Sequence, residues 1–290
     1  NKIIDTTIEA ARTAISEVVP PVGGPTSDIA VRGETSDITI LEIGPGRGVL
    51  TGALLKKFEK VLAVEKDDNL FVELGEKFAK EIEAGQLTLV HGDILELTPE
   101  KLGLANLEVQ PPSKSYATVA NIPYYITGQF LRTWLAGEHS EIQPSQKIEP
   151  CYAPPKFMVL MLQKEVAKRI VARDSKESLL SISVKAYGEP KYIETIKRGS
   201  FYPIPNVDSA ILLINNISKE FFSVANQEKE FFNILRAGFA HKRKFLINNL
   251  EAWLPSKEKL QKAFEFCEIS PKARAEDIKP EDCRCLAEKI

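Results

Sequence analysis

The chain has 290 residues and a formal net charge of −2, with 43% hydrophobic and 27% charged residues. This length fits one large domain plus a small one, the composition is that of an ordinary soluble globular protein, and no apolar run approaches the roughly 18 residues of a membrane span. The charge alone argues against a nucleic-acid partner, but the stretch from Lys197 to Ile290 has a small excess of Lys and Arg, a weak indication of a basic face.

The cysteines and histidines predict neither a metal site nor a disulfide framework. The spacing of Cys151, Cys267, Cys283 and Cys285 matches no zinc motif and no pattern of paired cysteines. We therefore expect free thiols in a reducing cytosol, a cytoplasmic location and no metal. The first residues do not form a secretory signal.

The first two thirds of the chain alternate strands and helices. After a helix over 3–19, strands are predicted over 37–43, 60–65, 87–90, 116–120 and 156–162, with helices over 49–58, 69–82, 128–135 and 164–172. Two more strands, 192–197 and 209–214, have too short a connection for a parallel crossover, so they should pair antiparallel. The pattern predicts an α/β fold with a doubly wound, mostly parallel, Rossmann-like sheet.

From about Asn215 the pattern contains only helices. They are predicted over 228–239, 244–254, 257–267 and 281–290. This change predicts two domains, residues 1–215 and a small helical domain over 216–290. The segment from Gly137 to Pro155 is polar and Pro-rich, and we expect an exposed loop there.

A glycine-rich turn follows the first predicted strand. Gly44, Gly46 and Gly48 come after Glu42 and before a helix, and glycine there lets the backbone approach a ligand closely. The spacing G-x-G-x-G differs from the dinucleotide pattern G-x-G-x-x-G and is typical of a loop that binds S-adenosylmethionine. A glycine-rich turn without a ligand is the alternative for this feature by itself.

Acidic residues end the next two strands. Glu65 ends the second strand, and a carboxylate there can accept both hydroxyls of a ribose. Asp93 ends the third strand, is followed by Ile94, and can accept from the amine of an adenine ring. A solvated strand end and a turn cap are the alternatives. Polar groups at successive strand ends favour one shared nucleotide site.

The fourth strand ends in Asn121-Ile122-Pro123-Tyr124. Asn121 offers an amide carbonyl, and Pro123 biases Ile122 toward extended geometry, which leaves its backbone carbonyl free to face a cleft. Tyr124 can stack on a flat ring. Two carbonyls beside an aromatic ring suit the exocyclic amine of a purine; a strand-ending turn with a buried Tyr is the alternative.

Taken together, these motifs resemble the KsgA-type ribosomal RNA adenine dimethyltransferases over nearly the whole chain. The resemblance is carried by Leu41–Thr51, Ala63–Glu65, Gly92-Asp93, Asn121–Tyr124, Gln163–Arg169, Phe201–Ala210, Phe239–Lys244 and Arg274–Asp277. It implies dimethylation of the N6 atoms of two adjacent adenines near the 3′ end of small-subunit rRNA, with S-adenosylmethionine as cofactor and an assembling 30S particle as partner. We expect a monomer.

The resemblance also implies roles for single residues. Asn121, Ile122 and Tyr124 would hold a flipped adenine, with Phe201 on its other face or, alternatively, in the core. Two basic groups would meet RNA phosphates: Lys164, Lys168 and Arg169, which share a helix face with Arg173, and His241, Lys242, Arg243 and Lys244. For the first group the alternative is pairing with neighbouring acids, and for the second it is a solvated helix start.

This chain departs from the family pattern in three places. Family members begin with a Gln-Asn/His-Phe-Leu segment that contacts the cofactor, and the chain starts where that segment would end, so we expect truncation or disorder of this segment rather than its true loss. Ile126–Gln129 stands where relatives often carry Ser/Thr-Pro, beside the expected target base. The segment from Gly137 to Pro155 is longer than usual.

Three other functions remain open at this point. The same chemistry on large-subunit rRNA is the nearest. A ribosome-assembly or transcription factor that binds cofactor without methylating is the second, and a small-molecule or DNA methyltransferase is the third.

Overall fold

The computed structural model describes the chain except for residues 1, 19–37, 100, 105–114, 137–153 and 223–225. It forms two compact units: Asn1–Lys164 with Lys191–Ile217, and Glu165–Pro190 with Ser218–Ile290. The sequence predicted one boundary after residue 215, whereas Glu165–Pro190 belongs to the second unit. Most of the expected 137–155 loop lies outside the described residues.

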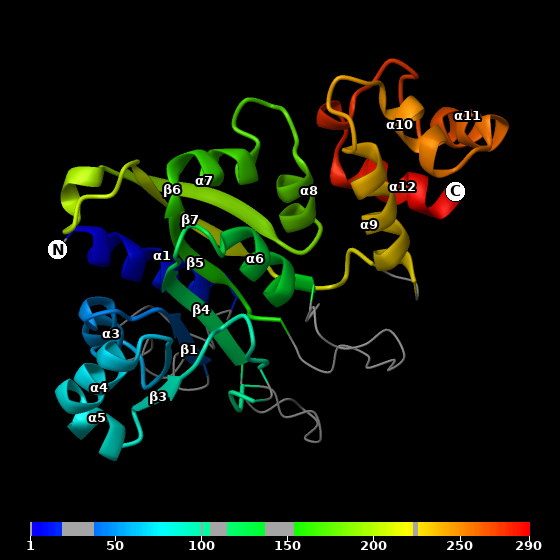
Figure 1. Cartoon of the computed structure of the whole chain (residues 1–290). Helices are drawn as coiled ribbons and strands as arrows, with labels where there is room; N and C mark the ends of the chain where they lie inside the picture. The colour runs from blue at the N-terminus through cyan, green and yellow to red at the C-terminus, as the bar shows by residue number, and fades with distance from the viewer. Residues whose placement is uncertain (1, 19–37, 100, 105–114, 137–153, 223–225) are drawn as a thin grey trace. The chain divides into compact units, whose positions relative to one another are not determined.

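A seven-stranded sheet organises the first unit, in the order β3-β2-β1-β4-β5-β7-β6 (Figure 1). The pairs from β3 through β5 are parallel, and β7 runs antiparallel to β5. The prediction of a mostly parallel sheet with an antiparallel last strand is confirmed. The bounds are β1 Ile38–Ile43, β2 Lys60–Glu65, β3 Leu87–His91, β4 Ser115–Asn121, β5 Met158–Gln163, β6 Glu189–Ile196 and β7 Ser209–Asn215.

The helices of this unit differ from prediction mainly where they end. They are α1 Lys2–Val18, α3 Val49–Leu54, α4 Asp68–Lys77, α5 Ala79–Glu83 and α6 Thr127–Ala136, with a 3-10 turn η1 at Arg198–Ser200. The single helix predicted over 69–82 is interrupted at Phe78, which leaves helical geometry at φ −112° and ψ 26°. The Phe78 side chain is buried, so packing decides this break.

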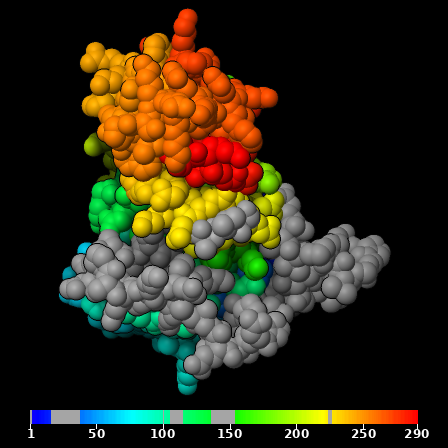
Figure 2. Space-filling model, turned by 90° about the vertical axis from the view of Figure 1, so that its right-hand side faces the viewer, coloured from blue at the N-terminus to red at the C-terminus, as the bar shows by residue number. Residues whose placement is uncertain are grey.

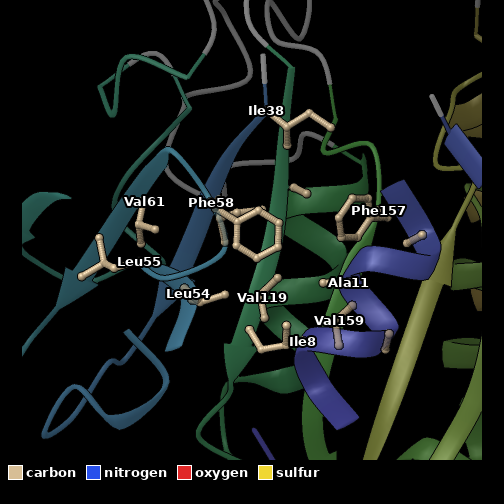
Figure 3. Packing of buried hydrophobic residues seen from close by; sticks show 14 of the residues in the cluster. Ile8, Ala11, Ile38, Leu54, Leu55, Phe58, Val61, Val119, Phe157 and Val159 are labelled. Carbon is tan, nitrogen blue, oxygen red and sulfur yellow. The ribbon is translucent and has the colours of Figure 1, made fainter. Parts of the chain in front are cut away.

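The core of the first unit lies between the sheet, α1 and α3. Figure 3 shows Ile8 and Ala11 of α1 pointing toward Val119 and Val159 of two neighbouring strands. These strands are buried on both faces, which explains why they read as nearly continuous apolar runs.

The second unit is helical. Its helices are α7 Lys164–Val171, α8 Leu179–Lys185, α9 Gln227–Gly238, α10 Leu246–Trp253, α11 Lys257–Phe266 and α12 Pro280–Lys289, with a 3-10 turn η2 at Ala275–Asp277. The first residue of α7, Lys164, still belongs to the first unit. α9 packs against α8, α10 and α12. None of the helices within the described ranges combines the length and apolar character needed to cross a bilayer.

The prediction of free cysteines is wrong for one pair. Cys267 and Cys285 form a disulfide across 18 positions, while Cys283 is free and buried. Spacing gave no sign of the pair, because the disulfide depends on α12 packing against α11. Figure 2 shows the red C-terminal residues beside the orange atoms of the preceding helices. Cys151 lies outside the described residues.

Candidate active site

A cavity of about 480 Å³ opens at the carboxyl ends of β1, β2 and β3 and beside the turn after β4. In sheets of this kind, ligands bind at this edge, and the volume is within the range of small-molecule sites. Its walls combine glycine, acidic and apolar side chains: Ile43, Gly44, Val64, Glu65, Lys66, Asp67, Asp68, Gly92, Asp93, Ile94, Pro123, Tyr125 and Ile126.

The glycine turn has the geometry that its composition predicts. Gly44, Gly46 and Gly48 all have positive φ, at 62°, 58° and 72°. A Cβ atom at Gly44 or Gly46 would meet nothing within 4 Å, so the backbone faces open space, whereas one at Gly48 would lie 2.5 Å from the Phe78 ring. The first two glycines therefore keep the ligand side clear, and the third allows close packing.

Glu65 holds the glycine turn in place. Its Oε2 accepts from the Gly46 N–H at 3.0 Å, and its Oε1 accepts from the N–H groups of Lys66 and Asp67 at 2.9 and 3.0 Å. The residue is only 6% exposed yet lines the cavity. It thus presents a fixed acceptor to a ligand.

Asp93 forms the other acidic wall. Its Oδ1 accepts from the Leu95 N–H at 2.9 Å, and its Oδ2 accepts from Lys66 Nζ at 2.7 Å. Burial by itself would raise the pKa of Asp93, but these hydrogen bonds and the Lys66 charge outweigh it and lower the pKa below its usual value. The carboxylate is therefore ionised at neutral pH. Its predicted neighbour Ile94 is buried and also lines the cavity.

The Asn121–Tyr124 turn borders the same cavity through Pro123. Asn121 is exposed, whereas Ile122 is 1% exposed and donates its N–H to the Met161 carbonyl at 3.1 Å. Tyr124 is half-buried, and its hydroxyl lies 2.7 Å from Ser209 Oγ. The glycine turn and this corner therefore open onto one space through Pro123, whereas Asn121, Ile122 and Tyr124 are not among the residues that line it.

Phe201 is half-buried and packs against the main hydrophobic cluster of the first unit. It does not line the cavity. Its expected place against a bound base stays a prediction.

Glu42 is a buried acid directly behind the glycine turn. It is 1% exposed, and its Oε2 has no hydrogen-bond partner among the described residues. Burial raises the pKa of Glu42 to about 8, and the charge of Glu65 adds to the rise, while nearby Thr51 lowers it only in part. Glu42 is thus largely protonated at neutral pH.

Two of the predicted basic residues of α7 lie beside acidic side chains, and a third is exposed. Lys164 Nζ lies 3.6 Å from Asp208, and Lys168 Nζ lies 3.3 Å from Glu165, so the expected pairing with acids does occur. Arg169 is exposed. The helix ends at Val171 and Ala172 has φ 52°, so Arg173 does not continue the predicted helix face.

The second basic group lies on a turn, not at a helix start. His241, Lys242, Arg243 and Lys244 connect α9 to α10, and all four are exposed. Asn249, 2% exposed, donates from Nδ2 to the carbonyls of Gly238 and His241 at 2.6 and 3.0 Å. This buried amide fixes the base of the turn.

A second cavity, of about 390 Å³, lies within the helical unit. Arg169 and Lys242, from the two predicted basic groups, both line it, together with Phe239. The structure therefore brings one residue of each group to a common surface.

The sequence missed several residues of these sites. Lys66, Tyr125 and Ile126 line the first cavity, and Asn249 anchors the basic turn. The position of Lys66 directly after Glu65 was the available signal; nothing in the sequence marked Asn249. Among the described residues, no group of three His, Cys, Asp or Glu side chains is arranged to hold a metal.

Known proteins share both the sequence and the fold. Residues 27–290 match the family described as "Ribosomal RNA adenine dimethylase". A "Ribosomal RNA small subunit methyltransferase A" from Dehalococcoides mccartyi is 38% identical over 249 residues, covering 86% of this chain and 77% of that protein. One of the same description from Fusobacterium nucleatum is 37% identical over 240 residues, with 82% and 81% covered.

Among solved structures, a dimethyladenosine transferase from Plasmodium falciparum has a TM-score of 0.67 at 24% identity, covering 98% of this chain and 94% of that one. At this identity the likeness supports the fold alone. The family match covers most of the chain and agrees with the glycine turn, the acidic strand ends and the Asn-Ile-Pro-Tyr corner, and the chain therefore belongs to the ribosomal RNA adenine dimethylase family.

Proposed function

We propose that this protein transfers methyl groups from S-adenosylmethionine to the N6 atoms of two adjacent adenines near the 3′ end of small-subunit rRNA. The observation that carries the proposal is the shared cavity of the glycine turn and the Asn121–Tyr124 corner. The small-subunit substrate named for the relatives favours this RNA over large-subunit rRNA.

The residues present fit the cofactor. The open space at Gly44 and Gly46 leaves room for a ligand against the backbone. Glu65 would accept from the ribose hydroxyls, and Asp93 would accept from the adenine amine, beside Ile94 and the apolar wall of Val64 and Ile126. The bound cofactor supplies an electrophilic methyl group on a sulfonium centre.

The corner residues would act on the target adenine. A base must leave its stack to reach them, at a cost of a few kcal/mol. Its ring would stack on Tyr124, and the carbonyl oxygens of Asn121 and Ile122 would accept from its N6–H. Those hydrogen bonds strengthen as positive charge develops on N6, so they favour the transition state over the ground state.

No strong base is needed in this scheme. The methylated nitrogen carries an acidic proton, which water at the exposed Asn121 can accept. A monomethylated adenine keeps one N6–H for the same carbonyls, so a second transfer can follow.

RNA binding would use the basic residues of the helical unit. Arg169 and Lys242 border one cavity with Phe239, which suits phosphates beside a stacked base. His241, Arg243 and Lys244 extend this surface on an exposed turn. Coupling to 30S assembly, a monomeric state and a cytoplasmic location belong to the same proposal.

Replacing Asn121 tests the mechanism. Asn121→Ala removes one of the two acceptors for N6–H, so methyl incorporation into small-subunit particles should fall by about 10²–10³-fold while particle binding stays nearly unchanged. Radiolabelled methyl transfer and filter binding measure the two. Asn69→Ala, at an exposed asparagine in α4, is the control. Equal activity of Asn121→Ala and wild type would defeat the assignment, and labelling of 50S but not 30S particles would redirect the substrate.

A further inference from the structure

The side chain of Ser209 is buried and hydrogen-bonds to Tyr124 of the Asn-Ile-Pro-Tyr corner. Ser209 is the first residue of β7, is 1% exposed, and has its Oγ 2.7 Å from the Tyr124 hydroxyl. Buried hydroxyls are nearly always hydrogen-bonded, so one partner is expected for Ser209. The partner is Tyr124, which lies 85 positions away in the sequence. The contact therefore depends on the tertiary fold.

The sheet order explains how they meet. Tyr124 follows β4, and Ser209 starts β7, with β5 between these strands. Asn121 pairs with Met161, and Gln163, two residues further along β5, pairs with Ser209. The Tyr124 side chain therefore reaches over the end of β5, and one hydrogen bond ties the corner to a strand two places away.

Ser209 is itself held firmly. The carbonyl of the preceding residue, Asp208, accepts from the Lys164 N–H at 3.0 Å. The Asp208 carboxylate accepts from the Arg198 N–H at 3.1 Å and from Lys197 Nζ at 3.3 Å. The hydrogen bond from the Arg198 N–H and the charge of Lys197 lower the pKa of Asp208, so it remains ionised at neutral pH. The start of β7 is thus a fixed anchor.

We propose that Ser209 is a positioning residue, which fixes the tilt of the Tyr124 ring against the flipped adenine. The inference rests on the proposed function, since it needs Tyr124 to contact the base. A tyrosine ring at a strand-end turn can rotate about two side-chain bonds, and a small misplacement of a substrate-positioning group lowers the rate markedly. Anchoring the phenol oxygen to the sheet removes that freedom before the base arrives.

A double-mutant cycle tests the inference. Ser209→Ala and Tyr124→Phe each delete this hydrogen bond while keeping the ring, so each should lower kcat about tenfold, the scale of one such bond, with the KM for S-adenosylmethionine unchanged. The double variant should be no slower than either single variant, because both remove the same contact. Thr118→Val removes a buried, unpartnered hydroxyl in β4 and is the matched control, expected to keep wild-type kcat.

Two results would overturn the inference. One is a kcat for Ser209→Ala within twofold of wild type, measured below the melting temperature of the variant. The hydrogen bond would then be a purely structural contact, even if its loss lowers the melting temperature. The other is a double variant whose loss equals the product of the single losses.

Tyr124→Ala separates this failure from failure of the proposed function. If Tyr124→Ala is strongly impaired but Ser209→Ala is not, only the positioning role is wrong. If Tyr124→Ala turns over like wild type, the base-stacking role of Tyr124 is wrong, and the positioning role falls with it.

Discussion

At the residue scale, Glu42 is a carboxyl group buried where its ionised form is disfavoured. The acid lies behind the glycine turn, near the carboxylate of Glu65, and its pKa is raised to about 8 from 4.5. A folded state that keeps the proton binds more protons than the unfolded state wherever the pH lies between those values. The contribution of Glu42 to the free energy of unfolding is therefore fully present below the unfolded-state pKa and is lost as the pH rises toward the folded-state pKa.

Glu42→Gln should remove this pH dependence. Between about pH 5 and about pH 8 the free energy of unfolding of wild type should fall by up to about 1.4 kcal/mol per pH unit from this group, whereas the neutral, isosteric amide contributes no slope. Urea unfolding of both proteins across that range measures the difference. Parallel curves for the two proteins would show that Glu42 ionises in the folded state at its ordinary pKa.

At the scale of elements, the turn between α9 and α10 presents charge from a fixed backbone. Its four basic side chains are exposed, and the buried amide of Asn249 holds the carbonyls of Gly238 and His241. Fixed cations need less ordering on binding than cations on a free loop. The turn is therefore suited to a defined set of phosphate contacts.

Lys242→Ala and Arg243→Ala should each weaken binding to small-subunit rRNA and reduce the slope of log K against log salt by about 0.7–1, as expected for one lost phosphate contact. A filter-binding salt titration measures the slope. Lys262→Ala, at an exposed lysine of α11 that pairs with Glu258 at 2.7 Å, is the matched control and should keep the wild-type slope. An unchanged slope in both turn variants would remove the turn from the RNA surface.

At the scale of the whole molecule, the second unit is built from two separate stretches of the chain. Ile182 and Val184 of α8 are fully buried, and α8 packs against α9 and α12. Tyr187 stacks on Phe232 with ring centroids 6.1 Å apart, and its hydroxyl donates to Glu228. Residues 165–190 therefore depend on residues 218–290 for their core.

A fragment ending at residue 217 should consequently not behave as a complete domain. It would expose the apolar face of α8, so we expect lower soluble yield and binding of a hydrophobic dye, neither of which the full chain should show. Expression tests and dye fluorescence measure these properties. A fragment as soluble as the full chain and without dye binding would show that 165–190 folds without its partners.

The strands and the site could be predicted from the sequence to different extents. The strands of the sheet were found within about two or three residues because buried parallel strands are short, apolar and β-branched. The glycine turn and the acids Glu65 and Asp93 were found because they lie at or just after the ends of strands. Their position at the edge of the sheet follows from the strand pattern of the sequence. Helix boundaries were found less well, as at Phe78, because its packing interrupts a continuous helical pattern.

The sequence by itself determined the fold class, the family and the residues at the carboxyl edge of the sheet, since each depends on local spacing along the chain. Only the tertiary structure decided the Tyr124–Ser209 hydrogen bond, the Cys267–Cys285 disulfide, the assignment of residues 165–190 to the helical unit and the raised pKa of Glu42. These depend on which distant segments pack together and how much water they exclude, and spacing along a chain carries neither quantity.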